Sequence, residues 1–177
     1  MKKNLGKKKD LSVLLPVMIV VLILAFIVGG LIYNSVTGGP EPMAEEYFAR
    51  MMERDGKGIL ELYRPETLTY VSKNTGVGLP AITKRVNSRI EGWYEQKILS
   101  VCGEVLSYEI DVLETVDAED DILQELEGIV GRSVSRAVTC KVEITVDGKD
   151  GDTKSTQSVY LMEIDDAWYL YGQGLLV

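Results

Sequence analysis

The stretch VYLMEIDDAWYLYG, Val159–Gly172, holds two apolar runs joined by a corner of two aspartates. Alternating apolar positions in each run predict a strand with one buried face, and Asp165-Asp166 between the runs predicts a tight turn. The side chains expected on the buried face of this hairpin are Tyr160, Met162, Ile164, Trp168 and Leu170. We therefore interpret the aromatic residues of this stretch first as packing residues of a sheet.

Two further strands are predicted upstream of the hairpin. Apolar residues recur at every second position in Val105–Glu114 and again in Ala137–Val146. The inward rows are expected to be Leu106, Tyr108, Ile110 and Val112 in the first strand, and Val138, Cys140, Val142, Ile144 and Val146 in the second. Between the two strands, residues 118–130 combine an acidic first turn with a helical apolar stripe, which predicts an inserted helix.

The part of the chain that precedes these strands has helical periodicity. Residues 44–51 and 59–63 each place apolar side chains on one helical face, and Asp55-Gly56 predicts the corner between them. Residues 81–98 give a third helix, whereas Leu68–Pro80 is interpreted as a short strand followed by a glycine-rich loop. Helices followed by strands predict an α+β fold, in which the helices pack on a curved antiparallel sheet.

Residues 11–33 form a run of 23 residues without a charged side chain. A helix of this length extends about 35 Å, enough to cross a hydrocarbon core of about 30 Å. All five lysines of residues 1–40 precede the run, so the positive-inside bias predicts a cytoplasmic N-terminus and an extracytoplasmic C-terminal part. A cleaved signal peptide is the alternative, but the run is longer than a usual signal and no A-x-A site follows it.

We therefore expect a single-pass protein of the cell membrane with four parts, whose first partner is the lipid bilayer around residues 11–33. The parts are a basic cytoplasmic tail (1–10), a transmembrane helix (11–33), a linker (34–42) and an extracytoplasmic domain (43–177).

Charge and composition exclude several classes of function for the outer part. The chain carries −8, with +4 in residues 1–40 and −12 in the remainder, so an acidic outer part would repel nucleic acid. Histidine is absent, which removes the commonest general base and the commonest transition-metal ligand. The acidic residues between Glu104 and Glu127 and the acidic corner DGKDGD (147–152) fit solvated faces better than a weak calcium site, and the spacing of the corner fails the EF-hand pattern. We predict neither a metal site nor a cofactor.

The opening helices Ala44–Tyr63 and the closing hairpin resemble the nuclear transport factor 2-like, or cystatin-like, superfamily. Members commonly end an early helix at an acidic residue, where Asp55 stands here, and close on a tryptophan followed by an aromatic, as Trp168-Tyr169 does. Ala167 departs from the lysine or arginine that is frequent at its position. A membrane anchor before such a domain is typical of small Gram-positive surface proteins and similar to the bitopic assembly subunit of type IV secretion and conjugation systems.

The resemblance implies a cone-shaped domain that is able to enclose a ligand. The candidate pocket residues are Trp93, Tyr94, Tyr108, Tyr160 and Trp168, with core packing as the competing interpretation of all five. Enzymes of the superfamily such as ketosteroid isomerase use an inward aspartate as base. Here Asp111 falls on the outward parity of its strand, so no catalytic residue is predicted.

Cys102 and Cys140 share parity with inward residues of the predicted strands. Two interpretations stay open, a disulfide between neighbouring strands and a pair of buried thiols. Neither cysteine has a histidine partner in the chain, so a thiol nucleophile is not expected.

These observations predict a membrane-anchored extracytoplasmic domain that binds an envelope protein or a small ligand and has no catalytic activity. One alternative is a structural subunit of a type IV secretion or conjugation complex, which predicts homo-oligomers. A cone-fold enzyme acting on a small molecule is a further alternative, and it requires an inward carboxylate.

Overall fold

The helices come first in the chain, as the sequence predicts. The computed structural model describes residues 38–172 and 176. The elements in chain order are α2 (Pro40–Met52), α3 (Gly56–Glu61), α4 (Pro65–Thr75), α5 (Leu79–Tyr94), the π-helical turn η1 (Glu95–Leu99), α6 (Ser100–Cys102), β1 (Val105–Asp117), α7 (Asp120–Val130), β2 (Arg136–Gly148), β3 (Gly151–Ile164) and β4 (Ala167–Leu170). The predicted α+β architecture is confirmed, including the helix inserted between the first two strands.

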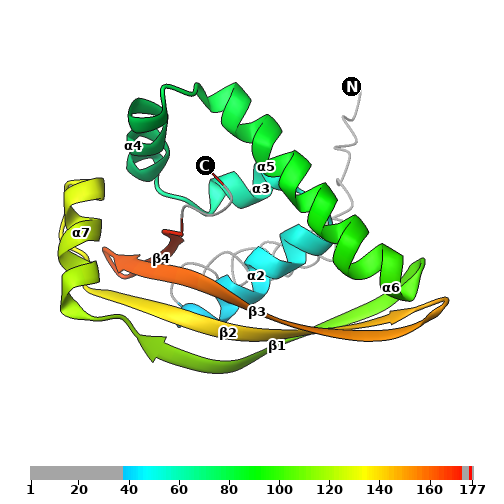
Figure 1. Cartoon of the computed structure of the whole chain (residues 1–177). Helices are drawn as coiled ribbons and strands as arrows, with labels where there is room; N and C mark the ends of the chain where they lie inside the picture. Colours follow the sequence, from blue (N-terminus) through cyan, green and yellow to red (C-terminus); the bar gives the residue numbers. More distant parts are fainter. Residues whose placement is uncertain (1–37, 173–175, 177) are drawn as a thin grey trace, which may run out of the picture. The chain divides into compact units, whose positions relative to one another are not determined.

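The four strands form one antiparallel sheet in the order β1-β2-β3-β4. Each strand therefore pairs with the next one along the chain, and α7 lengthens the first connection without changing this order. Figure 1 shows the three long strands as a twisted layer, with α2 and α5 on one side of it. The short β4 runs along only one end of β3.

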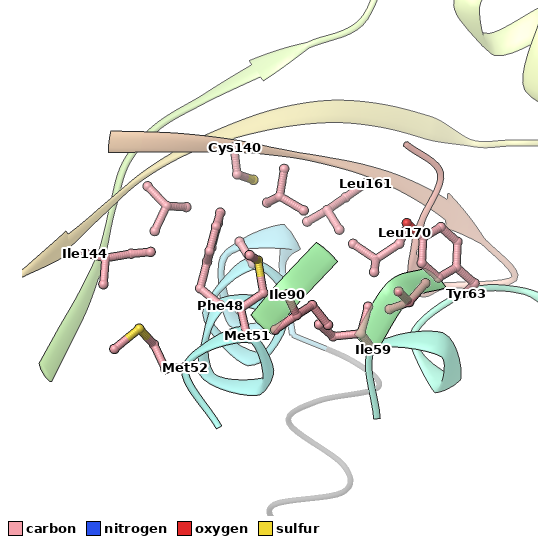
Figure 2. Packing of buried hydrophobic residues seen from close by; sticks show 14 of the residues in the cluster. Phe48, Met51, Met52, Ile59, Tyr63, Ile90, Cys140, Ile144, Leu161 and Leu170 are labelled. Atoms are coloured by element: carbon pink, nitrogen blue, oxygen red, sulfur yellow. The ribbon is translucent and has the colours of Figure 1, made fainter. Parts of the chain in front are cut away.

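The main core lies between α2, α3, α5 and one face of the sheet. From the helices, Phe48, Met51 and Ile90 pack toward side chains of β2 and β3 (Figure 2). The inward row predicted for β2 is confirmed, since its five members are buried without exception; they are Val138, Cys140, Val142, Ile144 and Val146.

A second, smaller cluster lies on the opposite face of the sheet. There α7 packs Leu126 and Val130 against Met162 and Ile164 of β3. The predicted hairpin is confirmed, and Met162 and Ile164 of its first strand are buried as predicted, but they do not share a face with Trp168 and Leu170. Val159 and Leu161 face the main core instead, and Tyr160 is exposed. The error arises because both faces of this end of the sheet are covered, so apolar alternation does not identify the core side.

The prediction of the inward row of β1 is correct only for the middle of the strand. Ile110 and Val112 pack against the main core, whereas Leu106 and Tyr108 are exposed. The register between β1 and β2 shifts between Val105 and Ser107, so Leu106 lies at an irregularity near the strand's start. An edge strand with such a shift does not keep a continuous buried row.

The short strand predicted in Leu68–Pro80 is wrong, and both this stretch and the end of the predicted linker are helical in the structure. Leu68–Pro80 contains most of α4, which begins at Pro65, buries Thr67 and Val71 one turn apart, and ends at Gly76 with a φ of +68°. Pro40 starts α2, so the end of the predicted linker 34–42 is the first helical turn. Proline is tolerated in both places because the first N–H groups of a helix have no partner within it.

The predicted transmembrane helix 11–33, the tail 1–10 and the first part of the linker lie outside the described residues. Within residues 38–172, none of the helices is long and apolar enough to cross a bilayer.

Candidate ligand-binding site

A cavity of about 340 Å³ lies between α2, α5 and β3. Aromatic rings make up much of its wall, and its floor is formed by β3 and by Leu170 of β4. The lining residues are Tyr47, Phe48, Met51, Tyr63, Trp93, Gln157, Ser158, Val159, Tyr160, Leu170 and Gly172. None of these eleven side chains is charged at neutral pH, which makes the cavity apolar with a few polar atoms.

The helices place the aromatic rings of the wall. Tyr47 and Phe48 are neighbours on α2, where their rings meet edge to face at 4.8 Å between centroids. Phe48 is the buried member and packs into the core, which fixes the ring of Tyr47 beside it at the cavity. Tyr63 follows α3 and donates a hydrogen bond from its hydroxyl to the carbonyl oxygen of Gly172 at 2.7 Å.

Burial raises the pKa of both Tyr47 and Tyr63 far above that of an exposed phenol. For Tyr63, the proximity of Tyr47 adds a smaller effect in the same direction. Both phenols are therefore protonated at neutral pH and do not serve as bases.

Trp93 provides the most informative polar atom of the site. Its ring lines the cavity, and its Nε1–H is buried without an acceptor in the described part of the chain. A buried donor that is left unpaired costs about 1–3 kcal/mol. Nearby, Gln157 donates from Nε2 to the hydroxyl of Ser155 at 3.0 Å, which orients its carboxamide.

Two of the five predicted pocket residues, Trp93 and Tyr160, line the cavity. The other three do not. Tyr94 packs under the guanidinium of Arg54 at 5.1 Å, Tyr108 is exposed on β1, and Trp168 fills the core. Sequence reasoning did not identify Tyr47 and Tyr63 as pocket residues. The sequence did contain a signal for them, because both are tyrosines of the predicted opening helices.

The carboxylate weighed as a catalytic base does not reach the cavity. Asp111 lies opposite Glu143 in the register of β1 and β2, and it is exposed on the outward face of the sheet. No aspartate or glutamate is among the eleven lining residues.

The disulfide hypothesis is wrong, because Cys102 and Cys140 are both buried free thiols. Cys102 ends α6 and lies against Gly148 at one end of β2. Cys140 lies eight residues along that strand, a distance of about 26 Å, whereas a disulfide needs Cα atoms within about 7 Å. Burial raises the pKa of both thiols, which keeps them in the unreactive protonated form.

A polar cluster lies where α4, α7 and the closing hairpin meet. Arg64 donates to Glu66 at 3.2 Å and to the hydroxyl of Tyr169 at 3.4 Å, and its guanidinium stacks over that tyrosine ring. Arg132 pairs with Asp165 at 3.0 Å. Each charge has an opposite charge beside it, so this cluster joins elements and leaves no charge for a ligand.

No metal-binding cluster of histidine, cysteine, aspartate or glutamate occurs among the described residues. Comparisons of the chain with known protein families, curated proteins and solved structures give no match.

Proposed function

We propose that this chain is a single-pass membrane protein whose extracytoplasmic domain binds an uncharged ligand in the cavity between α2, α5 and β3, without catalysis. The observation that carries the proposal is a cavity with aromatic walls and no charged lining residue, and one of its lining residues, Trp93, has a buried and unpaired Nε1–H within the described residues. This combination favours an apolar molecule or side chain that carries a hydrogen-bond acceptor.

The arrangement of the fold supports the same proposal. Helices that precede a four-stranded meander, with a cavity between helices and sheet, agree with a domain similar to the nuclear transport factor 2-like superfamily. Binding is favoured over catalysis because the cavity wall offers phenols with raised pKa values and no carboxylate or imidazole.

The test uses the two tryptophans as reporters. The full chain, labelled with ¹⁵N and reconstituted in nanodiscs, is titrated with acetanilide and a set of similar neutral aromatic amides. We expect the Trp93 indole N–H signal to shift while that of Trp168, which is packed in the core, stays in place. Trp93→Phe assigns the signal and removes the donor.

Tyr108→Phe is the matched control, because Tyr108 is an aromatic residue outside the cavity and its change should leave the titration unaltered. Equal shifts of both indoles, or no shift with any amide of the set, would contradict the proposal.

A second candidate is a structural subunit of an envelope complex. It is favoured by apolar side chains on the edge strand β1, where Leu106, Leu113 and Val116 are 62%, 53% and 51% exposed. Sedimentation of the full chain in detergent separates the candidates, since this function requires oligomers and ligand binding does not.

A further inference from the structure

One edge of β3 is open over most of its length. On one side, β3 pairs with β2 from Gly151 to Glu163. On the other side, β4 pairs only with Leu161–Ile164, and no strand of residues 38–172 lies beside Gly151–Ser158 (Figure 1). An open strand edge presents main-chain donors and acceptors to a further strand.

The hydrogen bonds beyond β4 identify the residues of this edge. The N–H of Tyr171 donates to the carbonyl oxygen of Tyr160 at 3.1 Å, so the main-chain groups of Tyr160 point to the open side. In a strand this direction repeats at every second residue. Ser158, Thr156 and Lys154 therefore point their N–H and C=O groups outward, and none of these groups bonds to main chain in the described part of the protein.

The cavity opens onto the same edge. Four consecutive residues of β3, Gln157 to Tyr160, line it. Neighbouring residues of a strand point to opposite faces, so a cavity that touches all four extends around the strand edge. An extra strand on this edge would therefore place a side chain in the cavity.

The far end of the edge is acidic. Asp147 and Asp152 are directly opposite each other in the pairing of β2 with β3, and Asp150 lies in the turn between these strands. All three carboxylates are exposed, and none forms an ion pair within the described residues. A cationic side chain would complement this end of the edge.

The other edge of the sheet is less suited to a partner strand. The register of β1 shifts twice against β2, and its exposed carboxylates include Glu109, Asp111 and Glu114. Register shifts of this kind discourage strand addition.

We propose that the ligand of this protein is an extended peptide segment that adds as a fifth strand to the open edge of β3, with an uncharged aromatic or aliphatic side chain in the cavity and a lysine or arginine near Asp152. This inference rests on the proposed function, because it uses the same cavity. Residues paired across two strands share a face. The apolar side chain of the peptide therefore lies opposite Gln157, on the core side of the sheet. The peptide position opposite Asp152 is five residues away along the peptide.

The probe is an acetylated and amidated peptide of sequence TKTVTVFT, in which lysine and phenylalanine are five residues apart. The control, TTKVTVFT, has the same composition but a spacing of four, which places the phenylalanine on the wrong face when the lysine is in register. With the full chain in nanodiscs, we expect the probe to shift the Trp93 indole signal and to slow amide hydrogen exchange of Lys154, Thr156 and Ser158 at least tenfold. The control should bind at least fivefold more weakly.

Main-chain pairing has its own test. The N–H groups of alternate probe residues point toward β3 or away from it. N-methylation of the residues that point toward β3 should weaken binding about fivefold to tenfold per lost hydrogen bond, and N-methylation of the others should have no effect. On the protein, Thr156→Pro removes an outward N–H without touching the bonds to β2, and Thr156→Val is its matched control. The methylated peptides give the same test on the unchanged protein if the proline variant does not fold.

The outcomes separate the two proposals. If neutral amides shift the Trp93 signal and the peptide neither shifts it nor protects the β3 amides, the peptide inference is overturned and the proposed function stands. A peptide that shifts Trp93 without protecting these amides overturns strand addition as well. If neither probe perturbs Trp93, both proposals fail.

Discussion

Asp55 shows how one side chain joins two helices. Its Oδ1 accepts the N–H of Gly58 at 2.9 Å, which caps α3, and its Oδ2 accepts Nη1 of Arg50, on α2, at 2.7 Å. A Cβ on Gly58 would collide with this carboxylate, so the glycine allows the close approach. The hydrogen bond from Gly58, followed by that from Arg50, lowers the pKa of Asp55.

Removal of this cap should destabilise the domain in a pH-dependent way. Asp55→Ala is expected to lower the free energy of unfolding by about 1–2 kcal/mol at pH 7. Because the folded pKa is lowered, the contribution of the charge is present above the unfolded pKa of about 3.9 and is lost as the pH falls through the folded pKa.

The measurement is urea unfolding of the full chain in nanodiscs at pH 7 and at pH 3, followed by tryptophan fluorescence. Asp55→Asn is the control, since asparagine keeps the cap without the charge. Its stability should differ from that of the wild type at pH 7 and approach it at pH 3; the same difference at both pH values would exclude a role for the charge.

At the scale of elements, the closing hairpin carries a conformation that its sequence does not favour. Asp165 and Asp166 have φ values of +54° and +62°, as a two-residue turn of this hand requires. Aspartate tolerates the left-handed region better than most residues, but glycine adopts it without the steric cost. Asp165 has a further role, because it pairs with Arg132 after α7.

The second turn position should therefore accept glycine with a gain. Asp166→Gly is expected to raise the free energy of unfolding by about 1 kcal/mol, because it removes the steric cost of a positive φ while Asp165 keeps its ion pair. Asp166→Ala is the matched control and should be no more stable than the wild type. Thermal unfolding of the wild type and the two variants measures these differences in stability. A loss of stability in Asp166→Gly would contradict the turn conformation.

Helix α4 shows where periodicity fails as a guide to elements. Leu68–Pro80 is interpreted from the sequence as a short strand and a glycine-rich loop, yet Pro65 starts a helix and Gly76 ends it. Only Thr67 and Val71 of α4 are buried, so the apolar stripe is too short to recognise. Where burial is extensive and one-sided, as in β2, the sequence predicted both the element and its inward face.

For the molecule as a whole, the fold class and the closing hairpin could be predicted, whereas the site could be predicted only in part. Trp93 and Tyr160 belong to different elements, and nothing local indicates that they share one cavity. Their meeting depends on how α5 crosses the sheet, which is a property of the packed domain. The same holds for the open edge of β3, because it exists only where β4 ends early.

The proposed membrane topology predicts a result for the whole chain in intact cells. A membrane-impermeant maleimide should label Lys154→Cys, on the exposed strand edge, but should label Lys3→Cys only after permeabilisation. The two native cysteines are buried, so the wild type serves as the unlabelled control. Gel shifts after labelling measure the result, and labelling of Lys3→Cys alone in intact cells would reverse the topology.

The core contacts of α2 have a consequence for the synthesis of the protein. Phe48 leaves the ribosome before Leu161 of β3, a member of the same core cluster that follows roughly a hundred residues later, a delay of about 5–20 s at ordinary translation rates. During that interval the apolar face of α2 has only the neighbouring helices to cover it. We therefore expect α2 to pack first with α3 and α5, before its sheet is complete.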